Sequence, residues 1–338
     1  MNNRIEYISP SSFYYWNRCP LSALYSKKYS NKQVFPKHPD GDLGNIIHYL
    51  YVKNKVDNKV SFNKKWHKEI KIINESYLKN PLQARFYPIQ WYSKYYAVKK
   101  QLLYKNLLNK EYSTEITKTD VKLLYEKWIN NEHIGGYVDL LIMQNDKVKE
   151  IIDFKTGNIF DIKNKKKEIK TVYKYQLALY CAVVIENQTY IPDLFIETLN
   201  GKRYQIEIDQ SYINNIANKA FELKQKINFA VESGNTASLA QCNPENCTNC
   251  NYRVFCSSYK LNLINKSLGK TIDVSGVIIN KSKTEIQLNN GLAIFTIRNI
   301  KVLESLSVGD NTSIFNLFYP DEEQTILYTS KNTIIYND

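Results

Sequence analysis

Along the first 110 residues, apolar positions recur at helical spacing. Residues 9–29, SPSSFYYWNRCPLSALYSKKY, predict one capped helix, because Ser11 or Ser12 can accept hydrogen bonds from free backbone N–H groups at its start. Residues 41–56, GDLGNIIHYLYVKNKV, predict a second helix. Residues 60–110 keep the helical pattern and are crowded with Tyr, Trp and Lys. We expect them to form a helical insertion that covers the core or grips a ligand.

In the middle of the chain the pattern changes to period two. Residues 113–128, 133–146 and 147–158 predict three successive strands that are joined by short polar turns. A lysine-rich run follows, then a helix at 172–186, a hairpin around Asn200-Gly201 and a long helix over roughly 211–233. This mixture of strands and helices predicts an α/β fold.

After residue 266 only short strands are expected. Turns at NNG and VGD separate five candidates, at 271–280, 284–288, 292–300, 312–319 and 325–336. Five short strands in about 70 residues favour a small closed or partly closed all-β barrel that resembles an OB-fold. We therefore predict two domains, 1–265 and 266–338.

Charge adds a preference for polyanionic partners. The 338 residues carry a formal charge of +13, and from Lys266 onward the net charge is −1, so the first 265 residues carry about +14. A lysine-rich composition from AT-biased coding contributes, but a cationic body still attracts nucleic acid in a salt-dependent way. Neither a membrane span nor a signal peptide is evident, and we expect a cytoplasmic protein whose cysteines are ligands or free thiols.

The densest chemical pattern is the stretch GYVDLLIMQNDKVKEIIDFKTG, residues 136–157. Asp153 and Lys155 are two apart and project from the same face of a strand, and a hairpin can bring Asp139 beside them. Two carboxylates with the carbonyl of Phe154 make an oxygen site suited to Mg²⁺ or Mn²⁺. A neighbouring lysine can orient and deprotonate water and stabilise charge on a phosphate, which is the equipment for phosphodiester hydrolysis.

The tripeptide D-x-K alone is common and equally suits an ordinary surface hairpin. The apolar run before Asp153, the TG turn after Lys155 and a second aspartate one hairpin earlier favour the metal site.

Four short motifs in order give a family resemblance. LGNIIH, GGYVD, IIDFKTG and QLALY resemble the RecB-like branch of the PD-(D/E)XK nuclease superfamily over roughly residues 8–260. The resemblance implies a mixed central sheet flanked by helices. It implies a metal site made by His48, Asp139 and Asp153, with Lys155 positioning the attacking water.

The same resemblance assigns further residues. Gln176 and Tyr180 match the Gln-x-x-x-Tyr helix, whose two side chains share one face and can contact the active lysine or the DNA, although such a pair often only packs. Glu115, on the first predicted strand, is a weaker candidate for an accessory acidic residue. Residues 163–170, KNKKKEIK, could contact the phosphate backbone or simply form a solvated loop. Cys181 is expected to be a buried small hydrophobe.

Residues 242–256, CNPENCTNCNYRVFC, hold four of the six cysteines. Cys242, Cys247, Cys250 and Cys256 could form a compact zinc site.

The resemblance implies a different set of ligands. Cys247, Cys250 and Cys256 match the C-terminal triplet of the iron–sulfur subfamily, which includes the AddB nuclease domain and the CRISPR adaptation exonucleases. The fourth ligand of that subfamily comes from an N-terminal CP pair, here Cys19-Pro20. Four thiolates suit a [4Fe–4S] cluster, which would close a very long loop and brace the domain, with Cys242 left as a bystander or a replacement ligand.

Together these features predict a Mg²⁺- or Mn²⁺-dependent deoxyribonuclease that acts on single strands or DNA ends, in DNA repair, recombination or defence. A catalytically silent DNA-binding or scaffolding member is the alternative, and RNA cleavage is not excluded. The sequence has no ATPase P-loop, so unwinding would need a helicase or another protein partner, for which the C-terminal domain is a candidate docking site.

Overall fold

The computed structural model describes residues 4–53, 58–109, 121–163, 165–299, 306–320 and 325–337. Backbone contacts divide the chain into two units, which are described separately. The first unit comprises Met1–Asn17 and Lys37–Gly234, and the second comprises Arg18–Pro36 and Asn235–Asp338. The domains expected at 1–265 and 266–338 stay a prediction.

The N-terminal helical pattern is interrupted at Cys19-Pro20. Helix α1 spans Pro10–Arg18 and α2 spans Leu21–Lys28, so the prediction of one helix over 9–29 is wrong. Proline has no N–H to donate and its ring clashes with the preceding turn. Pro20 instead stands at the N-cap of α2.

A five-stranded mixed sheet forms the centre of the first unit. Its order is β1 (Val121–Asn130), β2 (Gly135–Gln144), β3 (Lys147–Lys155), β6 (Asp193–Thr198) and β7 (Arg203–Gln205). The first three strands are antiparallel, β3 and β6 are parallel, and β7 pairs antiparallel with β6. The expected hairpin at Asn200-Gly201 is confirmed, and Gly201 supplies the positive φ of +76° that its turn requires.

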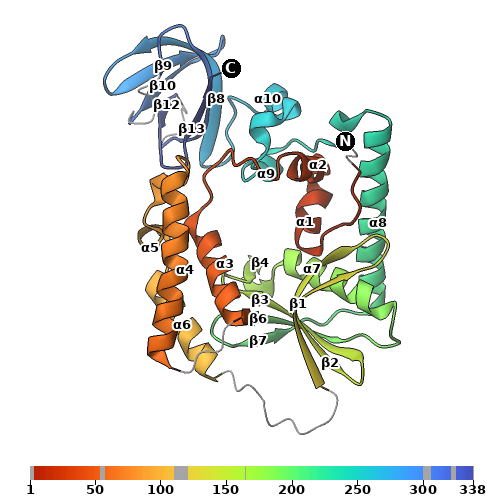
Figure 1. The fold of residues 1–338 in the computed structure, drawn as a ribbon. Coiled ribbons are helices and arrows are strands. Elements are labelled where there is room, and N and C mark those ends of the chain that lie inside the picture. Colours follow the sequence, from red (N-terminus) through yellow and green to blue (C-terminus); the bar gives the residue numbers. More distant parts are fainter. Residues whose placement is uncertain are drawn as a thin grey trace. The chain divides into compact units, whose positions relative to one another are not determined.

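Two long helices pack on this sheet. Helix α7 (Thr171–Ile185) contacts β1, β2 and β3 and packs against α8 (Gln210–Glu232), as Figure 1 shows. The middle of α7 is buried on every side, which explains its continuous apolar sequence. The Asp209 side chain caps α8 by accepting a hydrogen bond from Tyr212 N. Both predicted helices are confirmed.

The helical insertion has a core of its own. Its helices α4 (Lys59–Lys79), α5 (Ile89–Tyr92) and α6 (Tyr96–Asn109) and the short turn η1 (Ala84–Phe86) pack together with the preceding helix α3 (Pro39–Lys53). Their buried side chains include Leu43, Ile47, Trp66 and Tyr77, and Phe154 of β3 packs against the same cluster. The insertion therefore covers part of the sheet, and a ligand-gripping role stays a prediction.

The lysine run forms a hairpin and not a plain loop. Strands β4 (Phe160–Lys163) and β5 (Lys166–Ile169) pair antiparallel, with Lys165 in the left-handed region at φ 62°. Lys165, Lys166 and Lys167 are exposed, so their charges remain in solvent.

In its described residues the second unit has six strands, where five were expected. They are β8 (Thr271–Lys281), β9 (Glu285–Asn289), β10 (Ile294–Arg298), β11 (Asn311–Phe318), β12 (Ile326–Tyr328) and β13 (Ile334–Asn337). The sheet order is β12-β10-β9-β8-β11-β13, and β12 also pairs with β11. This extra pairing joins β8, β9, β10, β12 and β11 into a closed ring of neighbours, with β13 added beside β11.

The extra strand arises from a turn inside 325–336. Thr333 N donates to Ser330 O, and Ser330 N donates to Thr333 Oγ1. This turn separates β12 from β13, so that β13 can pair with β11.

The cysteine-rich segment consists of short helical turns. These are η2 (Thr236–Leu239), α9 (Pro244–Cys247), η3 (Arg253–Phe255) and α10 (Ser257–Asn262). Asn243 caps α9, and Pro244 occupies the first turn, where its missing N–H costs nothing. Within the described ranges, no helix has the length and apolarity needed to traverse a bilayer.

Candidate active site

The two aspartates meet on neighbouring strands of the first unit. Leu140 of β2 pairs with Ile152 of β3 at the end of the ladder, and Asp139 and Asp153 are the next residues on the two strands. Phe154 N donates a 2.7 Å hydrogen bond to Asp139 Oδ2. The expected hairpin is therefore present, and the Phe154 amide fixes the Asp139 carboxylate.

Asp153, Lys155 and Gln176 form one connected group. Asp153 is 2% exposed, its Oδ2 lies 2.7 Å from Lys155 Nζ, and its Oδ1 accepts a 2.8 Å hydrogen bond from Gln176 Nε2. Lys155 Nζ also lies 3.3 Å from Gln176 Oε1. Gln176 thus holds the carboxylate and the ammonium in one arrangement, as the Gln-x-x-x-Tyr motif implies.

Burial and charge shift the titration of this pair. Burial raises the pKa of Asp153 to about 6, against the opposing effect of the Lys155 ammonium. Burial alone would lower the pKa of Lys155, but the Asp153 carboxylate outweighs it and raises that pKa. Lys155 therefore keeps its proton while Asp153 is ionised.

His48 reaches the same place from helix α3. Its Nε2 lies 3.0 Å from Asp139 Oδ1, and its Nδ1 lies 3.6 Å from Glu126 Oε1 on β1. The adjacent Asp139 carboxylate raises the pKa of His48, while burial opposes this shift. The ring of Phe154 lies edge-on to the imidazole, with 6.1 Å between ring centroids.

Tyr180 contacts the backbone and not the acidic group. Its hydroxyl donates a 2.6 Å hydrogen bond to Tyr137 O, two residues before Asp139. Tyr180 is buried, and burial raises its pKa above the ordinary value. Tyr180 therefore fixes helix α7 to the backbone of β2, and this contact is called the brace below.

The side chains of Asp139, Asp153 and His48 offer donor atoms of the types that bind a divalent cation. Carboxylate oxygens are the usual ligands of Mg²⁺ and Mn²⁺, and an imidazole nitrogen is a ligand that transition-metal ions accept. His48 Nε2 and Asp153 Oδ2 are buried, and neither makes a hydrogen bond of good geometry despite its charged neighbour. Even so, the described residues contain no group of three or more His, Cys, Asp or Glu side chains arranged to hold a metal ion.

Two neighbours of the site escaped sequence reasoning. Glu126 lies between Tyr125 and Lys127, which pair with Leu140 and Val138 on either side of Asp139, so only the register of the two strands reveals it. Tyr173 lies beneath Lys155, with Nζ 5.1 Å from the ring centroid, and stands three residues before Gln176 on the same face of α7. Glu115 lies outside the described residues, and Cys181 is buried, as expected.

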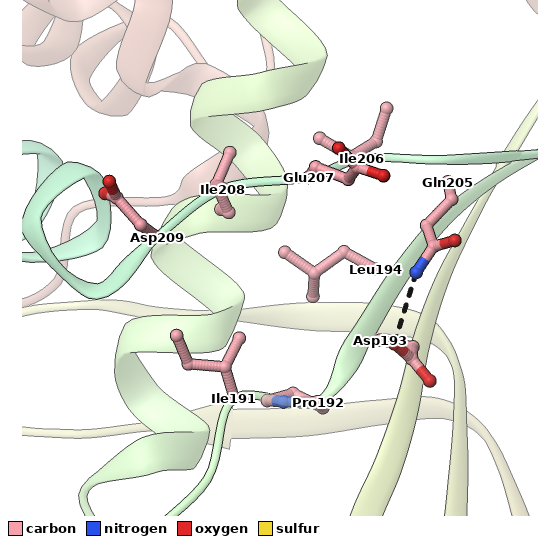
Figure 2. A pocket seen from close by; sticks show the side chains of 9 residues that line it. All are labelled: Ile191, Pro192, Asp193, Leu194, Gln205, Ile206, Glu207, Ile208 and Asp209. Carbon is pink, nitrogen blue, oxygen red and sulfur yellow. Dashed lines mark hydrogen bonds between the residues drawn. The ribbon is translucent and has the colours of Figure 1, made fainter.

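A separate pocket in the first unit is acidic. Its lining combines Asp193, Glu207 and Asp209 with Ile191, Ile206 and Ile208, and Gln205 Nε2 donates to Asp193 Oδ1 at 3.3 Å, as Figure 2 shows. Because parallel β3 and β6 pair Glu150 with Asp193 and Lys155 with Thr198, the pocket lies at the opposite end of these strands from Lys155. Its carboxylates would repel a phosphate backbone, so it is not a candidate nucleic-acid site.

Five cysteines gather in the second unit. Cys242 Sγ and Cys247 Sγ are 3.7 Å apart, Gln241 N donates to Cys19 Sγ at 3.5 Å, and Tyr252 N donates to Cys250 Sγ at 3.4 Å. Burial raises the pKa of Cys250 to about 11, and the neighbouring Cys19 and Cys247 add to this. The thiols are close enough to influence one another, although the described residues form no metal-holding group here either.

The chain was compared with protein families, with curated proteins and with solved structures. The family model described as the PD-(D/E)XK nuclease superfamily matches residues 7–257. No curated protein matches the chain. A candidate exonuclease from Eubacterium rectale of known crystal structure is 15% identical, with a TM-score of 0.40 over 68% of this chain and 82% of its own. That likeness is too weak to support an argument.

The family model covers well over half of the chain and includes His48, both aspartates, Lys155, Gln176 and Tyr180. Membership in this family indicates phosphodiester hydrolysis. The chain belongs to the PD-(D/E)XK nuclease superfamily.

Proposed function

We propose that the protein is a Mg²⁺- or Mn²⁺-dependent deoxyribonuclease that acts on single strands or DNA ends. The observation that carries this proposal is the meeting of Asp139, Asp153 and Lys155 on adjacent strands, with His48 at 3.0 Å from Asp139. A cationic body of 265 residues provides long-range attraction for a polyanion.

The proposed roles follow from the side chains. Asp139, Asp153, His48 and the Phe154 carbonyl would hold the cation, which when bound supplies Lewis-acid activation of the phosphodiester. Lys155 lies against Asp153, where its ammonium can orient water and offset charge that develops on the phosphate. Gln176 keeps Lys155 and Asp153 in register through two contacts.

Cleavage assays with single-stranded and duplex DNA test this function. Wild-type protein should cleave with Mg²⁺ or Mn²⁺ and stop with EDTA, and Lys155→Ala and Asp153→Ala should each lower the rate by at least about a hundredfold. Lys226→Ala, at an exposed position on α8, is a control that should keep the chemistry. No metal-dependent cleavage of any DNA by the wild type would reject the enzyme in favour of a silent DNA-binding member, and preference for RNA would revise the substrate.

We further propose that Cys19, Cys247, Cys250 and Cys256 hold a [4Fe–4S] cluster. The donor chemistry supports it, because four thiolates suit such a cluster, and so does the gathering of the cysteines in one unit. Zinc bound by Cys242, Cys247, Cys250 and Cys256 is the alternative, favoured by the 3.7 Å contact between Cys242 and Cys247.

Protein purified without oxygen separates these two metals. Broad absorption near about 400 nm, lost in Cys19→Ser and kept in Cys242→Ser, is expected for the cluster. A colourless protein with stoichiometric zinc, retained in Cys19→Ser, would establish the alternative.

The wider setting is proposed on the same basis. DNA repair, recombination or defence in the cytoplasm suits a DNase of this kind. The ring of strands in the second unit is proposed to be OB-like, and its net charge of −1 from Lys266 onward suits a protein partner such as a helicase as well as it suits DNA.

A further inference from the structure

An aromatic pair lies beside the acidic group on the same two strands. Tyr137 and Asp139 are two residues apart on β2, so both side chains project from one face of the sheet, about 6.6 Å apart along the strand. Trp128 of β1 pairs directly with Tyr137, and Glu126, two residues before Trp128, contacts His48. The strands therefore carry the aromatic pair and the acidic residues as neighbouring rows.

Both rings are exposed to solvent. Trp128 is 40% and Tyr137 is 64% exposed, with ring centroids 5.0 Å apart and planes at 65°. Tyr7 continues the group, its ring edge-on to Trp128 at 6.0 Å. Exposed clusters of large aromatic side chains are uncommon away from binding surfaces.

The glycines before Tyr137 make room for this arrangement. A Cβ atom on Gly135 would stand 2.9 Å from Trp128 Cζ2 and 2.9 Å from Tyr7 Cγ, too close for either ring to keep its place. The indole is fixed further by a 3.2 Å hydrogen bond from Trp128 Nε1 to Asn130 Oδ1. Tyr180 fixes the Tyr137 backbone from the other side. The rings are therefore held in advance of any ligand.

We propose that Trp128 and Tyr137 form a stacking platform that binds unpaired bases of a single-stranded nucleic acid next to the scissile phosphate. This inference rests on the proposed function and adds a binding subsite to it. The occupant is a base because every base offers a π-face to an exposed ring, whatever its sequence. The platform adjoins Asp139 of the candidate active site, and the net positive charge of the first 265 residues attracts the phosphate backbone of the same strand.

The platform selects against intact duplex. In a base-paired helix the faces of the bases are stacked on one another, and an aromatic side chain reaches them only after unstacking, which costs a few kcal/mol. A single strand or a frayed end presents its bases freely.

Binding without cleavage tests the platform apart from the chemistry. In EDTA, the affinity for a short single-stranded oligonucleotide should fall about tenfold in Trp128→Ala and in Tyr137→Ala, as loss of one base–aromatic stack predicts. Trp128→Phe should recover most of the affinity, because a phenyl ring still stacks. A 2-aminopurine base near the bound end should be quenched by the wild type and not by Trp128→Ala.

Phe229→Ala is the matched control, since Phe229 is 71% exposed on α8 and should leave binding unchanged. Blunt duplex should bind the wild type and Trp128→Ala equally. Unchanged single-strand affinity in folded Trp128→Ala and Tyr137→Ala, or an equal loss for duplex, would overturn the platform. These measurements use no metal, so a negative binding result would leave Lys155-dependent cleavage in place. Absence of cleavage would reject the enzyme but would not change the binding results.

Discussion

A single hydroxyl group links helix α7 to the strand that carries Asp139. Tyr180 is 3% exposed and its hydroxyl donates to the carbonyl of Tyr137. The sequence motif pairs Tyr180 with Gln176 four residues earlier, yet Gln176 donates to Asp153 and Tyr180 donates to the backbone of β2. Gln176 orders the charged groups, whereas Tyr180 orders the backbone that presents Tyr137 and Asp139.

Tyr180→Phe removes this hydroxyl and keeps the ring. It leaves the Tyr137 carbonyl, in a part-buried place, without this donor, so the free energy of unfolding should fall by about 1 kcal/mol. Urea denaturation followed by circular dichroism measures the change. Tyr175→Phe, on the same helix, should cost little, because the Tyr175 ring packs on Phe13 and takes no part in this hydrogen bond. Equal stability of Tyr180→Phe and the wild type would contradict the brace.

At residue scale the sequence was most informative where a motif fixes spacing. Asp139, Asp153 and Lys155 could be placed together in advance, because period two and a short turn determine which side chains meet, whereas Gln176 was assigned only through the family resemblance. Glu126 could not, since its place depends on the register of β1 against β2, with the positive φ of 46° at Glu126 marking a local irregularity.

At the scale of elements, strand β8 approaches β9 closely at Gly276. A Cβ atom there would lie 2.3 Å from Asn289 O, a backbone atom that cannot move without disturbing the pairing of both strands. Glycine is therefore required by close approach and not by an unusual φ.

Gly276→Ala should destabilise the second unit or prevent its strands from pairing. The reason is overpacking against a fixed backbone, which typically costs about 1–3 kcal/mol and more where nothing yields. Thermal unfolding and limited proteolysis would detect it. Val277→Ala, at the exposed neighbouring position, is the control and should leave the melting temperature nearly unchanged. A Gly276→Ala protein as stable as the wild type would mean that β9 can shift.

A buried ion pair connects the cysteine segment with the strands of the second unit. Asp273 of β8 is fully buried and accepts from Arg253 Nε at 2.6 Å, Tyr259 Oη at 2.7 Å and Asn316 N at 2.7 Å. Arg253 also donates to Cys250 O at 2.9 Å, and its guanidinium lies 4.4 Å from the ring centroid of Phe35. The fold of the cysteine segment and that of the strands therefore depend on one carboxylate.

Asp273→Ala should destabilise this unit strongly, by about 3–5 kcal/mol, because it leaves the Arg253 charge buried without a counter-ion. Denaturant unfolding measures the loss, and the metal content of the same preparation shows whether the cysteine segment is also disturbed. Glu285→Ala, which breaks the exposed pair with Arg298, should have little effect. Similar behaviour of the two variants would mean that Asp273 does not act as a buried counter-ion.

The elements themselves were predictable to different degrees. Helices α7 and α8 and the β6–β7 hairpin follow from long periodic stretches and from Asn200-Gly201. The break between α1 and α2 required giving more weight to Pro20 than to the apolar spacing around it. The β4–β5 hairpin has almost no apolar pattern, so charge composition alone favoured a loop for residues that pair through their backbones.

At the scale of the whole molecule, charge is the property that every nucleic-acid proposal shares. A net charge of +13 attracts a polyanion at long range, but only lysines near the bound strand release counterions. The β4–β5 hairpin follows the Asp153–Lys155 strand directly in the chain and exposes Lys165, Lys166 and Lys167. Exposed lysines of α4 carry the same charge at a different place in the first unit.

Neutralising the hairpin lysines should weaken single-strand binding and reduce its dependence on salt. For single strands the slope of log affinity against log salt is about −0.7 for each neutralised phosphate, so Lys165→Gln, Lys166→Gln and Lys167→Gln together should reduce its magnitude by about 2. Titrations in EDTA from low to high salt measure it. Lys64→Gln, Lys68→Gln and Lys79→Gln on α4 remove equal charge and should change the slope far less. Equal changes in both triple variants would assign the attraction to net charge, and an unchanged slope in the first would remove the hairpin from the interface.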